Sequence, residues 1–404
     1  MVGGTGAARY PIDPALQNLP WPEAERGLSL RGPLRRIPAM DSLPATRARP
    51  RAVVAMSGGV DSSVAAWLLA REGFELVGLF MRNGIHVTEA EARKKSCCSV
   101  GDARDARMVA AALGIPFQAV DLSDEFGGII RYFLAEYAAG RTPNPCAVCN
   151  RELKFGRLFD FAAELGAEYV ATGHYARIEH QGGRPRVLRG LDRDKDQSYQ
   201  LFCVHEENLA RTLLPLGGLQ KSAVRGLASE AGIRTAEKPD SQEICFVPGN
   251  DYRELLEQHG VELHPGELVD TAGRVLGRHE GTEHFTIGQR RGLGVAAGVP
   301  LYVVEIDTAG GRVVLGTAEQ CGSRALLASG LNWIGFDPPD EPFRAEVQVR
   351  YRHGAVPATV ELAGDAARVV FDAPEMAVAP GQGAALYHGE RLLGGGWIAR
   401  TEPV

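Results

Sequence analysis

The fold class is decided by residues 51–63, RAVVAMSGGVDSS. Residues 52–56 form a short apolar run that predicts a buried strand, and apolar residues recur at helical spacing from Val64 until Gly73. The glycine-rich turn of residues 57–63 lies between them. A strand, such a turn and a helix together direct unpaired backbone N–H groups and the positive end of the helix at an anion. Two glycines let the backbone approach a phosphate closely.

The following segments repeat this pattern. Residues 76–81, 116–120 and 168–172 read as strands, and residues 102–113 read as a helix. Alternating strands and helices predict an α/β domain with a doubly wound parallel sheet. Ligands of such sheets bind beyond the carboxyl ends of the strands. Those ends carry the glycine-rich turn, Met81 and Gly173-His174, although Met81 fits a plain core position and His174 a capping position equally well.

The glycine-rich turn differs from the common phosphate loop because no Gly-Lys-Ser/Thr follows it. Asp61 would repel a bare phosphate, so its presence makes sense chiefly if Mg²⁺ bridges the two. The turn resembles the pyrophosphatase-type loop of adenylating enzymes, which cleave ATP between its α and β phosphates. The alternative is a tight turn that binds no ligand.

Length and composition exclude several classes of protein. The chain has 404 residues, of which 45% are hydrophobic and 23% charged, as in soluble globular proteins of two or three domains. A net charge of −6 argues against a uniformly basic nucleic-acid coat protein, but not against local basic surfaces. No apolar run approaches the roughly 20 residues that span a bilayer, and no secretory signal is recognisable. We expect no membrane association.

The first fifty residues differ from the rest. They hold seven Arg, no Lys, four acidic residues and repeated prolines, and they lack apolar periodicity. This composition predicts a disordered leader. Two alternatives are a true translation start at Met40 and an organellar transit peptide.

Seven cysteines, an odd number, argue against a disulfide scaffold and for a reducing compartment, which we expect to be the cytoplasm. Cys146 and Cys149 precede basic residues at 151, 154 and 157, which would lower a thiol pKa. Cys245 is a second reactive candidate. Spacing alone leaves three hypotheses open: a zinc site that adds Cys97 and Cys98, purely structural thiols such as Cys203 and Cys321, and a redox-linked catalytic pair of Cys149 and Cys245.

Six motifs follow one another along the chain. They are Ser57-Gly58-Gly59-Val60-Asp61-Ser62, Asn144-Pro145-x-x-x-Cys149-Asn150, Gly173-His174-Tyr175-Ala176, Lys195-Asp196-Gln197-Ser198-Tyr199, Ser241-Gln242-Glu243-Ile244-Cys245-Phe246 and Thr286-Ile287-Gly288-Gln289-Arg290-Arg291-Gly292-Leu293-Gly294. From about Arg51 to the C-terminus, this order resembles the tRNA-specific 2-thiouridylase (MnmA) family.

The resemblance implies a reaction. Family members use ATP to adenylate the 2-oxygen of the wobble uridine, position 34 of tRNA, and replace it with sulfur, releasing AMP and pyrophosphate. By position, Cys245 would carry the sulfur as a persulfide and Cys149 would be the nucleophile. Either the persulfide attacks carbon 2 directly, or Cys149 first releases hydrosulfide. Both routes close a Cys149–Cys245 disulfide that a cellular reductant must reopen.

The resemblance also implies two sets of binding residues. ATP, with Mg²⁺ near Asp61 and no permanent metal or cofactor, would be bound by Ala55, Met56, Ser57, Gly58, Gly59, Val60, Asp61, Ser62, Met81 and Gly173. The tRNA would be bound by Asn144, Pro145, Cys146, His174, Lys195, Asp196, Gln197, Arg350, Tyr351 and Gln382. Some members carry Asp where this chain has Cys146, so we expect Cys146 to contact the target base without acting as a general base.

The expected architecture has four parts. A leader spans residues 1–50, and an adenine-nucleotide α-hydrolase-like catalytic domain spans 51–216. A small central α+β domain spans 217–298, with helices at 219–232 and 251–259. A C-terminal tRNA-binding β-barrel spans 299–404, in which a strand over 345–352 presents Arg350 and Tyr351. We expect a monomer that binds the anticodon loop and a sulfur donor, either a sulfur carrier or a cysteine desulfurase.

Two alternative functions remain open from the sequence. Another enzyme with the same loop, such as an ATP-dependent amidotransferase or a different tRNA modifier, would leave Cys149 and Cys245 idle. A non-catalytic RNA-binding protein would instead contain stoichiometric zinc.

Overall fold

The computed structural model describes residues 49–84, 100–240, 244–247 and 251–404. Most of the predicted leader, Met40, and the Cys97-Cys98 pair of the zinc hypothesis lie outside the described residues. Among the residues that are described, no helix is both long and apolar enough to cross a bilayer.

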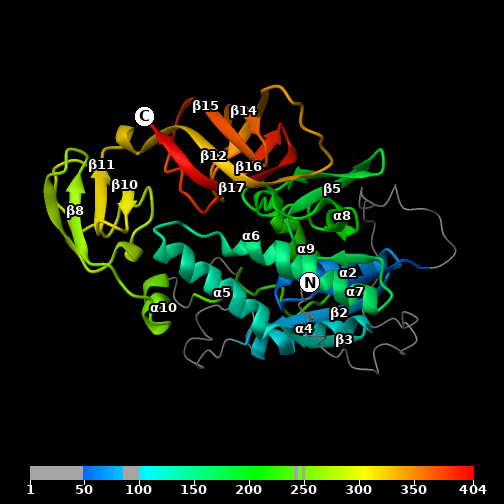
Figure 1. Ribbon diagram of the computed structural model, residues 1–404. Coiled ribbons are helices and arrows are strands. Elements are labelled where there is room, and N and C mark those ends of the chain that lie inside the picture. The colour runs from blue at the N-terminus through cyan, green and yellow to red at the C-terminus, as the bar shows by residue number, and fades with distance from the viewer. Residues whose placement is uncertain (1–48, 85–99, 241–243, 248–250) are drawn as a thin grey trace, which may run out of the picture.

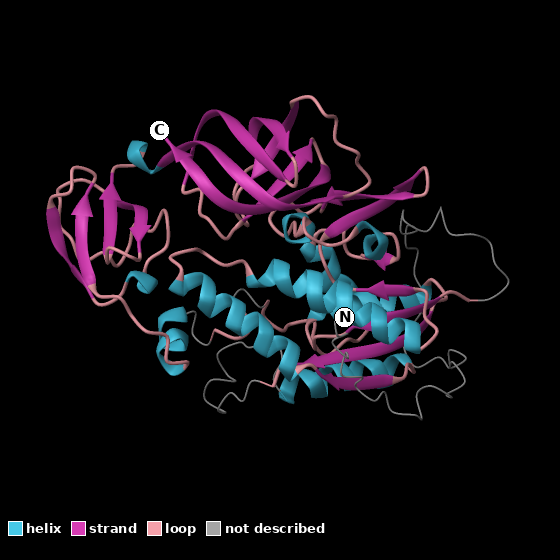
Figure 2. Cartoon of the chain, in the orientation of Figure 1, coloured by secondary structure: helices cyan, strands magenta, loops and turns pink. Residues whose placement is uncertain are grey.

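Parallel strands form the sheet that carries the glycine-rich loop (Figures 1 and 2). Their order is β3 (Phe117–Asp121), β2 (Glu75–Arg82), β1 (Arg51–Ala55), β4 (Tyr169–Ala171) and β7 (Thr212–Leu213). The chain moves outward from β1 to β3 and then returns to the other side of β1. The strand order thus reverses at β1, and ligands of such sheets bind beyond the carboxyl ends of the strands at the point of reversal. The predicted doubly wound parallel sheet is confirmed.

Helices cover both faces of the sheet. The side chains of β1 point alternately to the two faces, and they are apolar on both, so each face needs a covering layer. Ala52 and Val54 pack with α2 (Val60–Arg71), α4 (Val100–Leu113) and α9 (Lys221–Glu230). Val53 packs on the opposite face with two further helices, which are α5 (Ser123–Ala138) and α7 (Leu158–Glu164). The domain boundary expected after residue 216 thus precedes a helix, α9, that shares its core with α2.

A second sheet forms the small central unit. Its order is β10 (Tyr302–Asp307), β11 (Arg312–Gly316), β8 (Gly266–Asp270) and β9 (Val275–His279), around a separate core that includes Leu268 and Val313. The helix α10 (Tyr252–Gln258) connects it to the parallel-sheet domain. Tyr252 stacks on Tyr137 of α5, with the ring centroids 4.3 Å apart. Figure 1 shows this unit at one end of the molecule.

The C-terminal strands close into a barrel. They are β12 (Gly322–Trp333), β13 (Phe343–Gln348), β14 (Val356–Ala363), β15 (Ala366–Met376), β16 (Gly383–His388) and β17 (Arg391–Pro403), and pairing of β12 with β17 closes the ring. The hairpin of β5 (Ala176–Gln181) and β6 (Arg184–Arg189) extends the same sheet from β17. The parallel-sheet domain and the barrel are therefore joined by backbone hydrogen bonds as well as by packing.

The expected strand over residues 345–352 is wrong at its end. The strand β13 stops at Gln348, and Arg352 has a left-handed backbone with φ of 62°. The amide of Gln348 and the backbone N–H of His353 both donate to the Arg350 carbonyl, which bends the chain into a turn. The alternation of apolar residues continues through this turn, so it imitates a longer strand.

Candidate functional site

The glycine-rich loop links the end of β1 to the start of α2. Gly59 occupies the N-cap position and has no side chain to satisfy the first N–H groups of the helix. Hydroxyls stabilise the loop from within: Ser63 donates to the Gly59 carbonyl at 2.8 Å, and Ser62 accepts from the Ser57 N–H at 3.1 Å. The helix N–H groups and the exposed Ser57 side chain are thus presented at a rigid turn, as anion binding requires.

Gly58 is required at its position for two reasons. Its φ is +74°, and a Cβ added there would lie 2.2 Å from the Asp102 carbonyl oxygen. Residues that carry a side chain rarely adopt that backbone conformation. The Asp102 oxygen belongs to the backbone, so it cannot rotate away from an added Cβ.

Gly58→Ala is therefore expected to destabilise the fold by about 1–3 kcal/mol, or to displace the loop and weaken nucleotide binding. Denaturant unfolding and calorimetric titration with α,β-methylene-ATP measure the two effects. Gly218→Ala is the matched control, because a Cβ there meets nothing within 4 Å. If both variants match the wild type, this account of the loop is incorrect.

Three predicted nucleotide residues lie at or just beyond the carboxyl ends of the neighbouring strands. Ala55 ends β1, and Met81 is half-buried near the end of β2. Gly173 follows β4, and a Cβ on it would lie 2.9 Å from the Ser62 backbone nitrogen. The structure thus brings β4 against the first turn of α2, where only a residue without a side chain fits.

Asp61 is the centre of a charge network that the sequence analysis missed. Lys221 of α9 donates to both Asp61 oxygens at 2.7 Å, and the Tyr175 hydroxyl donates at 2.7 Å. Lys221 also lies 2.9 Å from Asp240. Burial would raise the pKa of Asp240, but hydrogen bonds from Lys195 and Lys221 outweigh it and lower that pKa to about 2. Asp61 and Asp240 are thus held together by a shared lysine.

The surroundings of Asp61 suit a magnesium ion. The Asp61 carboxylate offers the hard oxygen ligand that Mg²⁺ prefers when it also binds phosphates. The exposed Ser57 side chain and the N–H groups at the start of α2 lie next to it and could bind the phosphates. The Lys221 ammonium already contacts both oxygens of the Asp61 carboxylate. The site therefore accommodates a cation. Among the described residues, no group of three or more His, Cys, Asp or Glu side chains could hold a metal by itself.

Cys149 ends a short helix, α6 (Pro145–Cys149), whose first turn is capped by Asn144. The Asn144 side chain accepts from the Ala147 N–H at 3.1 Å. A π-helical segment, η2 (Asn150–Arg157), follows Cys149 directly. Such segments are rare and are frequent at functional sites. Of the predicted base-contacting residues here, Cys146 is exposed, whereas Asn144 and Pro145 are buried.

Cys245 lies in a turn in which the Val247 N–H donates to the Ile244 carbonyl. The adjacent Phe246 is buried edge-to-face against Phe133 of α5, with centroids 5.2 Å apart. Cys245 and Cys149 are both half-buried and pack against the same hydrophobic cluster. The first three residues of the motif, 241–243, lie outside the described residues.

Two other thiols are structural. Cys203 and Cys321 are buried, and each donates to a backbone carbonyl. Burial raises the pKa of Cys203 to about 12 and also raises the pKa of Cys321. Neither thiol is an effective nucleophile at neutral pH.

His174 is a buried neutral imidazole. Its Nδ1 lies 2.7 Å from the Thr172 hydroxyl, and its ring is 5.6 Å from that of Phe155. Burial, and then the charge of Lys154, hold the pKa of His174 well below its usual value. The side chain can therefore order the turn after β4 without carrying a charge.

This shift predicts a pH effect on stability. Below a pH of about 6.5 the unfolded chain binds a proton at His174 that the folded chain does not, so stability falls by up to about 1.4 kcal/mol per pH unit. His174→Gln is expected to lose this contribution. Denaturant unfolding at pH 7.5 and pH 5.5 should show a larger loss for the wild type than for the variant; equal losses would argue against a neutral buried His174.

The predicted tRNA residues on the segment 195–197 are already engaged inside the molecule. Lys195 pairs with Asp240 at 2.7 Å. Asp196 accepts from Arg189, Ser198 and the Gly190 N–H, and Gln197 accepts from the Tyr175 N–H at 3.0 Å. Contact with RNA by Asp196 or Gln197 would compete with these bonds.

Tyr351 and Arg350 lie in the turn after β13. Burial raises the pKa of Tyr351, and the positive charge of Arg352 opposes this rise. The rings of Tyr351 and Tyr199 are 6.4 Å apart. Arg350 is exposed. The barrel thus contributes an aromatic and an exposed basic side chain at this turn.

Gln382 holds the barrel against the start of α6. Its amide donates to the carbonyls of Thr142 and Pro143 at 3.2 and 2.8 Å, and the Thr142 N–H donates to Pro380. The predicted tRNA contact of Gln382 stays a prediction, but its side chain already orients the segment that leads to Cys149.

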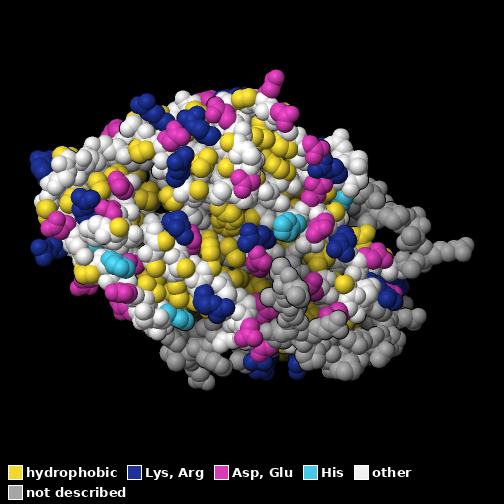
Figure 3. All heavy atoms as spheres, in the orientation of Figure 1, with side chains coloured by type: hydrophobic (Ala, Val, Ile, Leu, Met, Phe, Trp, Pro, Cys, Tyr) yellow, Lys and Arg dark blue, Asp and Glu magenta, His cyan; other side chains and the backbone are white. Residues whose placement is uncertain are grey.

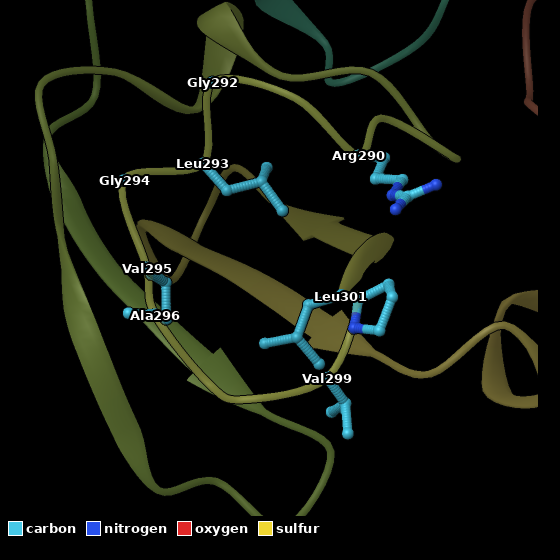
Figure 4. A pocket seen from close by; sticks show the side chains of 9 residues that line it. Arg290, Gly292, Leu293, Gly294, Val295, Ala296, Val299 and Leu301 are labelled. Carbon is cyan, nitrogen blue, oxygen red and sulfur yellow. The ribbon is translucent and has the colours of Figure 1, made fainter.

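Two surface features lie outside this site. On the face in Figure 3, Lys and Arg side chains of the described residues are interspersed with acidic ones and do not merge into one basic patch. A cavity of about 410 Å³ opens in the central unit along the loop from Arg290 to Leu301 (Figure 4). Its lining combines apolar side chains with Arg290 and backbone polar atoms, and it contains none of the candidate catalytic residues.

Comparison with known families covers most of the described chain. The tRNA methyl transferase HUP domain matches residues 50–249, the tRNA methyl transferase PRC-barrel domain matches 253–317, and the aminomethyltransferase beta-barrel domain matches 323–398.

Individual relatives match along nearly their whole length. The tRNA-specific 2-thiouridylase MnmA of Geobacter metallireducens is 50% identical, over 88% of this chain and 99% of the relative. Proteins of the same name from Carboxydothermus hydrogenoformans and Rhodopirellula baltica are 48% and 45% identical. Each alignment covers 87% of this chain, and 98% and 96% of the respective relative.

Proposed function

The chain belongs to the tRNA-specific 2-thiouridylase family, and from this premise we propose that it catalyses the ATP-dependent 2-thiolation of the wobble uridine, position 34, of tRNA. As a family member it is a sulfur-transferring enzyme that acts on tRNA. The residue roles, the adenylation step and the persulfide are the finer parts of the proposal.

ATP binds at the glycine-rich loop in this proposal. The N–H groups at the start of α2 and the Ser57 hydroxyl receive phosphate oxygens, and Ala55, Met81 and Gly173 border the nucleotide. Asp61 holds Mg²⁺, which when bound neutralises phosphate charge. Lys221 is then a second cation beside the phosphates, and its contact with both Asp61 oxygens supports this role.

Adenylation solves a chemical problem. The 2-oxygen of uridine is a poor leaving group, whereas the same oxygen joined to AMP leaves readily. The uridine oxygen therefore attacks the α-phosphorus of ATP, and pyrophosphate departs. The target base must leave the anticodon stack to reach the loop, at a cost of a few kcal/mol.

Sulfur transfer uses the two half-buried cysteines. In the direct route, the terminal sulfur of a Cys245 persulfide attacks carbon 2, and AMP departs with the former 2-oxygen. The Cys149 thiolate then attacks the Cys245 sulfur, which breaks the bond to the transferred sulfur and forms a Cys149–Cys245 disulfide. In the other route Cys149 releases hydrosulfide first. Both routes need a sulfur donor and an external thiol reductant, and both leave the same disulfide.

The tRNA surface of the proposal combines both large domains. The exposed Cys146 comes from α6, and the half-buried Tyr351 and the exposed Arg350 come from the barrel. Phosphate contacts from basic residues would supply affinity, and unstacked bases would pack on aromatic rings. We propose the barrel as the tRNA-binding domain.

The observation that carries the proposal is the glycine-rich loop with its charged partners, because Lys221 of α9 and Tyr175 both contact Asp61 at the start of α2. Cys149 and Cys245, the proposed sulfur-transferring pair, are both half-buried and pack against the same extended hydrophobic cluster. Deletion of the gene followed by mass spectrometry of tRNA nucleosides tests it. Loss of wobble 2-thiouridine is expected, and its persistence would refute the function.

A further inference from the structure

Two segments with predicted tRNA contacts, residues 195–197 and residues 350–351, belong to different domains but are joined by buried side chains. Arg189 is the last residue of β6, and Gln348 is the last residue of β13. Neither belongs to a motif that the sequence analysis identified. The fold places both of them between the two segments.

A chain of hydrogen bonds, which we call the bridge, runs through these side chains. Nη1 of Arg189 donates to the Asp196 carboxylate at 3.2 Å and to the Gln348 amide oxygen at 3.1 Å. The Gln348 amide nitrogen donates to the Arg350 carbonyl at 3.1 Å. The bridge therefore connects a predicted tRNA residue of the parallel-sheet domain with the turn of residues 350–353 in the barrel.

The orientation of the Gln348 amide is fixed by its partners. The residue is only 4% exposed, so water does not replace a lost partner. A guanidinium can only donate and a carbonyl can only accept, so the opposite orientation would place donor against donor and acceptor against acceptor. The His353 N–H donates to the same Arg350 carbonyl from the other end of the turn. Gln348 thus holds the turn in one conformation.

Arg189 is itself held in place inside the protein. Its guanidinium carbon lies 3.7 Å from the centroid of the buried Tyr387 ring. Its partner Asp196 also accepts from the N–H and the hydroxyl of Ser198, at 3.0 and 2.9 Å. The side chains of Arg189 and Asp196 are only 17% and 9% exposed. Arg189 is therefore better placed to support Gln348 than to contact an RNA phosphate.

We propose that Gln348, held by Arg189, is a positioning residue for tRNA binding. It keeps the turn in the conformation that presents the exposed Arg350 and the half-buried Tyr351 side chains. The bridge also fixes this turn relative to residues 195–197, so one tRNA meets both segments in a preset arrangement. Without the bridge, the turn would have to be ordered when tRNA binds, and that ordering costs affinity. This inference rests on the proposed tRNA-binding role of the barrel.

The test measures the affinity of the full-length protein for unmodified tRNA by fluorescence anisotropy at one fixed salt concentration. Gln348→Glu is nearly isosteric: its carboxylate still accepts from Arg189 but cannot donate to the Arg350 carbonyl. Its Kd for tRNA is expected to rise about tenfold, the effect of one lost hydrogen bond that leaves a buried group unpaired. Hydrogen–deuterium exchange of the free variant should rise in residues 350–353. Calorimetry with α,β-methylene-ATP should show unchanged nucleotide binding, which a general loss of structure would not leave intact.

Two comparisons exclude simpler causes. Gln348→Met removes the amide without adding a charge, so a similar loss of affinity shows that repulsion of RNA is not the cause. Gln320→Glu is the matched control, because the Gln320 amide also bonds at both ends but takes no part in the bridge. It accepts from the Thr317 N–H and donates to the Thr271 hydroxyl, each at 2.9 Å. This control should bind tRNA as the wild type does.

Arg189→Met tests the support of Gln348. It should also weaken tRNA binding, and the double variant with Gln348→Met should bind about as weakly as Arg189→Met alone, because both changes act through the Arg350 carbonyl. Additive losses would show that Arg189 acts by another route and would overturn the bridge. If Arg189→Met fails to fold, the two Gln348 variants decide.

The proposal is overturned if both Gln348 variants bind tRNA as tightly as the wild type, or if only Gln348→Glu is weakened. Unchanged hydrogen exchange in the turn of Gln348→Glu would also overturn it. The proposed function fails separately. A wild type that forms no 2-thiouridine refutes the function, whereas a wild type that forms it, but is matched in tRNA affinity by the Gln348 variants, refutes the bridge alone.

Discussion

Cys245→Ser is expected to reduce formation of 2-thiouridine by roughly 10³-fold or more, because a serine hydroxyl cannot carry a persulfide and removal of a covalent nucleophile has effects of this size. ATP cleavage and tRNA binding should persist, since Cys245 lies in the turn of residues 244–247 and not in the glycine-rich loop. Nucleoside mass spectrometry measures the product, and pyrophosphate release in the presence of tRNA measures the first step.

Loss of 2-thiouridine together with retained ATP cleavage would assign Cys245 to sulfur transfer. Cys321→Ser is the matched control: Cys321 is a buried thiol with a raised pKa, and its variant should thiolate normally per folded molecule. Normal thiolation by Cys245→Ser would remove this residue from the mechanism.

Asp61→Ala is expected to reduce AMP and pyrophosphate formation by roughly 10²–10³-fold, the range seen when one group that stabilises the developing charge of a transition state is lost. The change removes the proposed magnesium ligand and one of the two carboxylates that Lys221 contacts, while Asp240 remains. Pyrophosphate release in the presence of tRNA measures the effect. Since Asp61 precedes sulfur transfer in this scheme, 2-thiouridine should fall in parallel.

The control for Asp61→Ala is Asp337→Ala. This change also removes an ion-paired carboxylate, but Asp337 is exposed and lies between β12 and β13 of the barrel. It should leave both products unchanged. Unaltered pyrophosphate formation by Asp61→Ala would contradict the magnesium role.

The parallel sheet was predictable because its signals are local. The apolar run of β1, the glycine-rich turn and the periodicity of α2 lie within about twenty residues, and each fixes the conformation of its neighbours. The helix α5 also had a readable signal that was missed: Phe126, Ile129, Phe133 and Tyr137 recur at helical spacing and are all buried.

Other elements depend on partners far along the chain. The hairpin β5–β6 is short and rich in charged residues, and it completes its pairing through Leu188 and Arg391, which are some two hundred residues apart. The strand β12 was also missed, and it is stabilised on both sides by β15 and β17. Such long-range pairing leaves little trace in local alternation. The turn at Arg350 shows the opposite case, because apolar residues alternate through it although β13 has already ended.

The motifs identified the loop and the cysteines, but not the charges around them. Lys221 is 160 residues from Asp61, and in sequence it is an ordinary lysine at the start of a helix. Only the fold brings it to the loop. Gln382 and Asp196 show the converse: the motifs predict RNA contacts, and the structure reveals that both also make intramolecular hydrogen bonds.

The central claim is that the uridine 2-oxygen leaves on AMP and is replaced by sulfur. The most direct measurement uses purified protein, ATP, Mg²⁺, a persulfide donor, and unmodified tRNA whose wobble uridine carries ¹⁸O at position 2. The account predicts 2-thiouridine at position 34 together with AMP that contains the ¹⁸O atom. Formation of 2-thiouridine with unlabelled AMP, or AMP without 2-thiouridine, would contradict it.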